Sequence, residues 1–124
     1  MNNIQKGRLG EQIALNYLID NNASILDTNY RIKTGEIDII AKLNEELVFI
    51  EVKSRSNIKF GYPSEAVNYN KIRKIINTAK YYMLKNNLNN MPIRFDVIEI
   101  YYNKSGYKIN HIKQAMDYQE SIDF

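Results

Sequence analysis

Three charged residues interrupt a stretch of sequence that is otherwise typical of two buried strands. Asp38, Glu51 and Lys53 lie inside the apolar runs "EIDIIA" and "VFIEVK". A charge inside a sheet is unfavourable unless it is paired or bound to a metal. Two carboxylates and an ammonium group together can hold a divalent cation, polarise a phosphodiester oxygen and activate a water molecule. The spacing therefore indicates metal-dependent hydrolysis, with a salt-bridged sheet surface as the alternative.

The two runs are short enough to form a hairpin that turns at residues 44–45, and the turn fixes which residues face each other. This register places Asp38 opposite Glu51 and Glu36 opposite Lys53. The other side of the hairpin is apolar and is assigned to the core, with the pairs Ile37–Val52, Ile39–Ile50 and Ala41–Val48. Like charges directly opposite each other destabilise a sheet. A divalent cation between the two acids would remove that repulsion.

A third carboxylate, Glu11, lies on a helix that the apolar spacing predicts over residues 4–21. It shares a helix face with Gly7 and Ala14, whose small size would let the helix approach the sheet closely. Glu11 is thus a candidate third ligand. The alternative is an exposed residue that pairs with Lys6 or Arg8.

The basic residues form two groups, which together predict a track for a phosphate backbone. The first group follows the acidic site and the second begins the next helix: Lys53, Arg55 and Lys59, then Lys71, Arg73 and Lys74. The formal net charge of +3 and the pI of about 9.0 are compatible with nucleic-acid binding. The second group could equally be the solvated side of an amphipathic helix.

Composition limits the chemistry further. The 124 residues fit one domain and include no cysteine and a single histidine, His111. Thiolate zinc sites, histidine clusters and Ser-His-Asp triads are therefore excluded or nearly so, and oxygen ligands favour Mg²⁺ or Mn²⁺. The first residues lack the apolar core of a signal peptide and no run is long enough to span a membrane. We therefore expect a cytoplasmic protein that does not contact membranes.

Periodicity predicts an α/β domain with a central mixed sheet flanked by helices. The expected order is a helix, a meander of three strands, a second helix and two further strands. The meander is antiparallel, and the second helix crosses over to place the strand of Arg94 parallel to the strand of Glu51. One domain is expected over residues 1–116, followed by an acidic C-terminal tail at 117–124.

The arrangement of Asp38, a hairpin and "EVK" resembles the PD-(D/E)xK nuclease motif, although the proline of that motif is absent here. More closely, six segments in order resemble the YraN-like family: "GRLGEQIALNYL", "GEIDIIA", "FIEVKSR", "FGYPSEAV", "RFDVIEI" and "HIKQA". That family consists of small bacterial proteins regarded as predicted endonucleases, distantly similar to archaeal Holliday-junction resolvases. The resemblance covers almost the whole chain.

The resemblance implies a restriction-endonuclease-like fold and Mg²⁺-dependent cleavage of DNA, including branched or structured DNA. It makes Glu11, Asp38 and Glu51 metal ligands, with Lys53 the catalytic lysine. Similar junction enzymes act as dimers, which leaves a homodimer open. A second hypothesis is a non-catalytic nucleic-acid-binding module of the same fold, and a glycoside hydrolase is a remote third. Asp96 and His111 are interpreted as structural residues.

Overall fold

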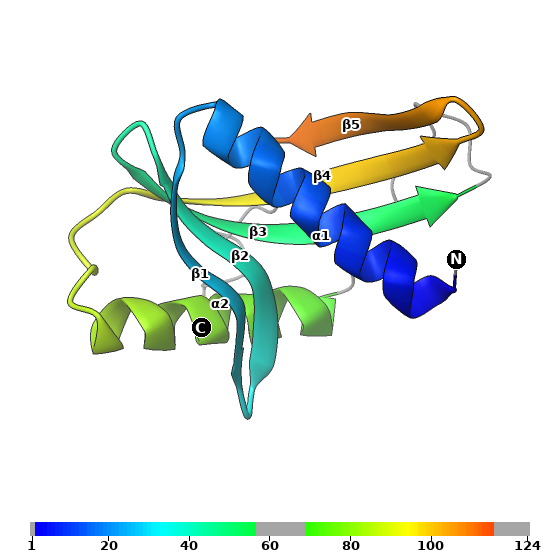
Figure 1. Ribbon diagram of the computed structural model, residues 1–124. Helices are drawn as coiled ribbons and strands as arrows, with labels where there is room; N and C mark the ends of the chain where they lie inside the picture. Colours follow the sequence, from blue (N-terminus) through cyan, green and yellow to red (C-terminus); the bar gives the residue numbers. More distant parts are fainter. Residues whose placement is uncertain (1, 57–68, 116–124) are drawn as a thin grey trace.

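Figure 1 shows a curved sheet with one long helix on each of its faces. The computed structural model describes residues 2–56 and 69–115. Its elements in chain order are α1 (Asn3–Asp20), β1 (Ser24–Ile32), β2 (Gly35–Leu43), β3 (Glu46–Ser56), α2 (Tyr69–Lys85), β4 (Ile93–Asn103) and β5 (Gly106–Ile112). The first helix, α1, lies within one residue of the predicted range 4–21, and each strand is within a few residues of its expected bounds.

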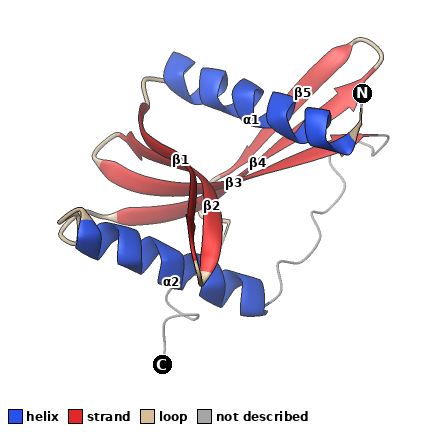
Figure 2. Ribbon diagram, turned by 60° about the horizontal axis from the view of Figure 1, so that its bottom comes forward, coloured by secondary structure: helices blue, strands red, loops and turns tan. Residues whose placement is uncertain are grey.

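The five strands form one mixed sheet in the order β1-β2-β3-β4-β5. β1, β2 and β3 are antiparallel neighbours, β3 and β4 are parallel, and β5 returns antiparallel to β4. Figure 2 shows α1 and α2 on opposite faces of this sheet. The α/β class, the mixed sheet and the parallel crossover are confirmed. The element order is the one that the sequence predicted.

The β2–β3 hairpin turns where the sequence predicted. Asn44 and Glu45 have φ angles of 51° and 68°, the left-handed conformation at both positions that a two-residue hairpin turn uses. The ladder that follows pairs Ile39 with Ile50 and Ala41 with Val48. This part of the predicted register is confirmed.

Both faces of the sheet are buried, whereas the hairpin register assigned only one of them to the core. α1 covers one core and α2 covers the other. The α1 core contains Ile39, Ala41, Val48, Ile50 and Ile98, and the α2 core contains Ile37, Ile40, Phe49, Ile76 and Phe95, each with further members. Because helices cover both faces, Asp38, Glu51 and Lys53 are partly buried between layers rather than displayed on an open surface.

α1 approaches the sheet at one glycine. The helix begins after Asn2, whose side chain accepts a hydrogen bond from the Gln5 amide while the Gln5 side chain accepts one from the Asn2 amide. Further along, a Cβ atom added to Gly10 would collide with the Ser54 hydroxyl. Glycine allows this approach without displacing Ser54 and so brings the middle of α1 against β3.

The predicted tail at 117–124 and residue 116 lie outside the described residues. Within the part of the chain that the structure describes, no helix has both the length and the apolar character needed to cross a membrane.

Candidate active site

Asp38 lies where β2 and β3 separate. Their ladder ends at the pair Ile39–Ile50, and the β1–β2 hairpin bends away from β3 beyond that pair (Figure 1). The Val52 amide donates a 2.8 Å hydrogen bond to the Asp38 Oδ2 atom. A side-chain carboxylate thus takes the place of a backbone acceptor at the point of separation, which fixes the orientation of Asp38.

The predicted facing pairs beyond this point are wrong. Asp38 opposite Glu51, Glu36 opposite Lys53 and Ile37 opposite Val52 all require the ladder to continue, and the observed pairs stop at Ile39–Ile50. Ile37 packs in the α2 core while Ile39 packs in the α1 core. The regular alternation of the strand is therefore broken between them, which is where Asp38 lies.

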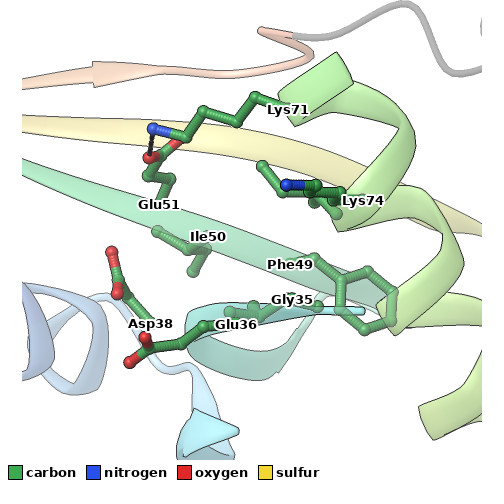
Figure 3. Close-up of a pocket in the computed structure, with 10 residues that line it drawn as sticks. Gly35, Glu36, Asp38, Phe49, Ile50, Glu51, Lys71 and Lys74 are labelled. Atoms are coloured by element: carbon green, nitrogen blue, oxygen red, sulfur yellow. Dashed lines mark ion pairs between the residues drawn. The ribbon is translucent and has the colours of Figure 1, made fainter. Parts of the chain in front are cut away.

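Glu51 projects from β3 toward α2. Its Oε1 atom forms an ion pair with the Lys71 ammonium, which Figure 3 shows as a dashed line. The Glu51 side chain is 16 % exposed, and its buried Oε2 atom has no hydrogen-bond partner among the described residues. One oxygen of this carboxylate is therefore paired with Lys71, and the other retains acceptor capacity.

Two cavities meet at Asp38. The first, which we call the α2 cavity, has a volume of about 290 Å³ and is lined by Glu36, Asp38, Glu51, Lys71 and Lys74 above the apolar side chains of Ile37, Phe49, Ile50 and Ile75. Figure 3 shows Asp38 and Glu51 on two strands at one side of it. The second, the α1 cavity, has a volume of about 300 Å³ and contains Glu11 beside Asp38. The structure thus brings all the predicted acids to the surroundings of Asp38.

The charges of these acids act on Asp38. Burial is the largest cause that raises the pKa of Asp38 to about 6. The bond from the Val52 amide opposes this shift, and the neighbouring charges of Glu11, Glu51 and Glu36 add to it. Burial and then the charge of Glu36 likewise raise the pKa of Glu11. Acids held together without a cation between them are destabilised in their charged forms.

The donor set can be compared with what a metal needs. No three metal-ligating side chains of residues 2–56 and 69–115 are grouped closely enough to hold an ion as they stand. The chemistry of the set nevertheless suits a hard cation, because Asp38 and Glu51 offer carboxylate oxygens, one of them without a partner. Glu51 is engaged by Lys71 instead. A cation that binds both acids would compete with this ammonium for the charge of Glu51.

Lys53 lies on β3 two residues beyond Glu51 and is partly buried. Alternation along the strand puts its side chain on the same face as that of Glu51. In the parallel ladder it is opposite Glu99. Neither of the two cavities is lined by Lys53. Its catalytic role stays a prediction that rests on its place in the strand.

The basic residues predicted to contact nucleic acid have different environments. Arg55 is 12 % exposed and donates a 3.0 Å bond to the fully buried Glu99, so its guanidinium group has a structural partner that competes with a phosphate contact. Arg73 and Lys74 are exposed on α2, and Lys71 and Lys74 line the α2 cavity. Lys59 lies outside the described residues.

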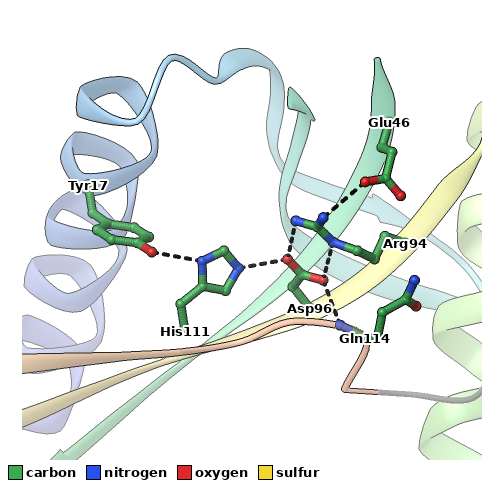
Figure 4. Close-up of polar contacts among 6 residues, drawn as sticks. All are labelled: Tyr17, Glu46, Arg94, Asp96, His111 and Gln114. Carbon is green, nitrogen blue, oxygen red and sulfur yellow. Dashed lines mark hydrogen bonds and ion pairs between the residues drawn. The ribbon is translucent and has the colours of Figure 1, made fainter. Parts of the chain in front are cut away.

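Two buried polar networks have no signal in the sequence pattern. One surrounds Glu99, which also accepts bonds from the Tyr101 hydroxyl and the Asn110 amide. Figure 4 shows the other, in which Arg94 donates to Asp96. His111 is hydrogen-bonded to Asp96 through Nε2 and to the Tyr17 hydroxyl through Nδ1. The structural interpretation of Asp96 and His111 is confirmed. The partners of His111 are Tyr17 on α1 and Asp96 on β4.

The comparisons with known sequences agree with one another. A family model described as "Uncharacterised protein family UPF0102" matches residues 10–100. A UPF0102 protein of Clostridioides difficile (strain 630) is 61 % identical over 115 residues, which cover 93 % of this chain and 99 % of that protein. Similar proteins of Alkaliphilus oremlandii and Persephonella marina are 50 % and 44 % identical, covering 88 % and 90 % of this chain and 95 % and 93 % of their own lengths.

Comparison with solved structures gives a weaker likeness. The structure of Pyrococcus furiosus SfsA in complex with Ca²⁺ superimposes with a TM-score of 0.41 at 12 % sequence identity. The match covers 94 % of this chain, which spans 65 % of the length of that protein.

Proposed function

The chain belongs to the uncharacterised protein family UPF0102, the YraN family, and we propose that it is a metal-dependent endonuclease that hydrolyses phosphodiester bonds in DNA. The observation that carries the proposal is the state of Asp38. Burial and the surrounding acids raise its pKa to about 6, and it lies where two cavities meet. A strongly perturbed carboxylate in a cleft is a typical functional group.

Asp38 and Glu51 are the residues that would hold Mg²⁺ or Mn²⁺, with Glu11 on the α1 side of the same carboxylate. When bound, such an ion polarises a phosphodiester oxygen and lowers the pKa of a water molecule. The Val52 amide holds the Asp38 carboxylate in a fixed orientation through its 2.8 Å bond. The protein's own contribution is therefore a rigid acid at the edge of the β2–β3 ladder.

The lysines supply positive charge around this acid. Lys53 would stabilise the negative charge that develops on the phosphate, or orient the attacking water, from the strand that carries Glu51. Lys71 and Lys74 would attract the DNA backbone at the mouth of the α2 cavity. Structured or branched DNA is the substrate class that we favour, by analogy of fold alone.

A non-catalytic nucleic-acid-binding module is the second candidate, and one observation favours it. The Lys71 ammonium already neutralises Glu51, so part of the acidic charge is balanced without a metal. In that case the basic residues of α2 would bind a phosphate backbone while the acids keep a structural role.

A cleavage screen separates the two functions. The purified protein is incubated with linear, single-stranded, flapped and four-way DNA in Mn²⁺ and in Mg²⁺. We expect cleavage of at least one substrate, lost in Asp38→Ala and in Lys53→Ala and retained in Asp20→Ala, which removes an exposed acid at the end of α1. Salt-dependent binding without cleavage in either metal would favour the binding module. Cleavage that survives both Asp38→Ala and Lys53→Ala would show that these residues do not form the catalytic site.

A further inference from the structure

The α1 cavity is distinct from the α2 cavity in its walls, although both contain Asp38. Its lining comes from the first turns of α1 and the second half of β3, with Lys6, Gly7 and Glu11 on the helix and Val52 and Ser54 on the strand. The volume of about 300 Å³ is at the lower end of the range of sites that bind small ligands. A cavity of this size can receive part of a nucleotide.

The α1 cavity is lined by charges of both signs. Glu11 and Asp38, whose charges interact, belong to the acidic group of the candidate active site, while Lys6 precedes Glu11 by more than one turn of the helix. Neutral polar groups accompany Lys6, namely Asn3 and the Ser54 hydroxyl, which donates a 3.2 Å bond to the Lys6 carbonyl. A phosphate is repelled at the acidic end without a cation and attracted at the lysine end.

Two glycines on α1 differ in what surrounds them. A Cβ atom on Gly10 would collide with Ser54, whereas a Cβ atom on Gly7 would meet nothing within 4 Å. Packing against the sheet therefore explains Gly10 but not Gly7. Gly7 weakens the helix relative to alanine. Its missing side chain leaves space at the lining of the α1 cavity.

We propose that the α1 cavity binds the sugar-phosphate unit next to the cleaved bond of the substrate strand, with Lys6 contacting its phosphate and Gly7 leaving the space that the strand occupies. This inference rests on the proposed function for the identity of the ligand as a nucleic-acid strand. The strand reaches Asp38 along α1, so the cleaved phosphate lies at the acidic end and its neighbour lies beside Lys6.

Size and charge are tested separately by the binding of fluorescent DNA at low salt, with Ca²⁺ present to offset the repulsion at the acidic end and a gel to check that the strand stays uncut. Gly7→Leu adds a bulky side chain to the lining of the α1 cavity, at a position where a Cβ atom meets nothing within 4 Å, and Gly7→Ala adds a single methyl group as its matched control. We expect Gly7→Leu to weaken DNA binding at least tenfold while its melting temperature equals or exceeds that of the wild type. Gly7→Ala should bind DNA within about threefold of the wild type, since a methyl group leaves most of the cavity open.

Lys6→Gln and Arg8→Gln remove one positive charge each from the same part of α1, and only Lys6 lines the cavity. A lysine that contacts a phosphate contributes about 0.7–0.9 to the slope of log affinity against log salt concentration. Lys6→Gln should lower the slope by that amount and Arg8→Gln should change it less. Equal slopes in these two variants would show that Lys6 does not contact a phosphate.

The outcomes separate this inference from the proposed nuclease activity. DNA binding by Gly7→Leu that equals the wild type overturns the inference even if Mn²⁺-dependent cleavage is found. Loss of binding in Gly7→Leu supports the α1 cavity as a strand-binding site even if no cleavage is found, in which case the site holds a strand that is not cut and the nuclease proposal fails. Absence of DNA binding by the wild-type protein overturns the inference.

Discussion

Asp38 and Asp96 are two aspartates of one sheet whose carboxyl groups behave in opposite ways. Asp96 is fully buried, and burial alone would raise its pKa. Hydrogen bonds from His111, Arg94 and the Gln114 amide nevertheless hold that pKa below its ordinary value. Asp38 accepts one bond, from the Val52 amide, and its pKa rises to about 6 through burial and neighbouring acids.

The opposite pKa shifts of Asp38 and Asp96 follow from the groups that surround each carboxylate rather than from how deeply it is buried. The Asp96 network joins α1, β4 and β5 through cationic and hydrogen-bonding groups (Figure 4), so the charge of Asp96 holds elements together. Asp38 is surrounded by Glu11, Glu51 and Glu36, so its charge disfavours the folded state. A fold that retains such a conflict usually does so for function.

Asp96→Ala should produce the largest loss of stability in the comparison. It leaves the buried Arg94 without its principal partner, and breaking a buried ion pair from one side costs about 3–5 kcal/mol. Urea denaturation at neutral pH measures the free energy of unfolding, with Asp20→Ala as the exposed control. A loss below about 1 kcal/mol, the level of an exposed ion pair, would show that the network of Asp96 is not a structural clamp.

Asp38→Asn should increase the free energy of unfolding, whereas Asp96→Ala lowers it. The pKa of Asp38 is raised from 3.8 to about 6 in the folded protein, so wild-type stability falls as the pH rises through this window and stays lower above it. Asparagine keeps an acceptor for the Val52 amide and carries no charge. We therefore expect Asp38→Asn to gain about 1–3 kcal/mol at pH 7 and nothing at pH 3.

Denaturation curves across this pH range test the sign. A variant that is less stable than the wild type at pH 7 would mean that Asp38 is satisfied in the folded state, as Asp96 is.

Lys71→Gln should give the smallest effect, on metal affinity rather than on stability. Lys71 and Glu51 are 44 % and 16 % exposed, and pairs with an exposed partner contribute about 0.2–1 kcal/mol. Removal of the competing ammonium should therefore raise the affinity for Mn²⁺ by about 1.5- to 5-fold. Lys74→Gln removes a charge from the same cavity and is the matched control. Weaker Mn²⁺ binding in Lys71→Gln than in Lys74→Gln would contradict competition at Glu51.

The hairpin shows how far the sequence alone could predict the site. Apolar alternation and the polar turn at residues 44–45 correctly predicted the pairs Ile39–Ile50 and Ala41–Val48. The prediction fails beyond Ile39 because the Asp38 side chain takes the Val52 amide. A local strand separation made by a side chain has no periodic signal, so the register appeared to continue.

The helices and the polar networks show which tertiary contacts the sequence could not predict. Spacing correctly predicted α1 and α2, but not that their two cores would enclose both sides of the hairpin. The contacts of Asp96 with His111 and of Glu99 with Arg55 join residues 15 and 44 positions apart. Such pairs depend on tertiary packing, which a single sequence does not reveal.

The most direct test of the account is a calorimetric titration of the protein with Mn²⁺. The wild-type protein should bind the ion at a site that includes Asp38, and its affinity should fall as the pH is lowered through about 6, where this carboxylate takes up a proton. Asp38→Asn, folded and at least as stable, should lose this binding. Equal Mn²⁺ affinity in Asp38→Asn and the wild type would contradict the claim that the acids around Asp38 form a cation site.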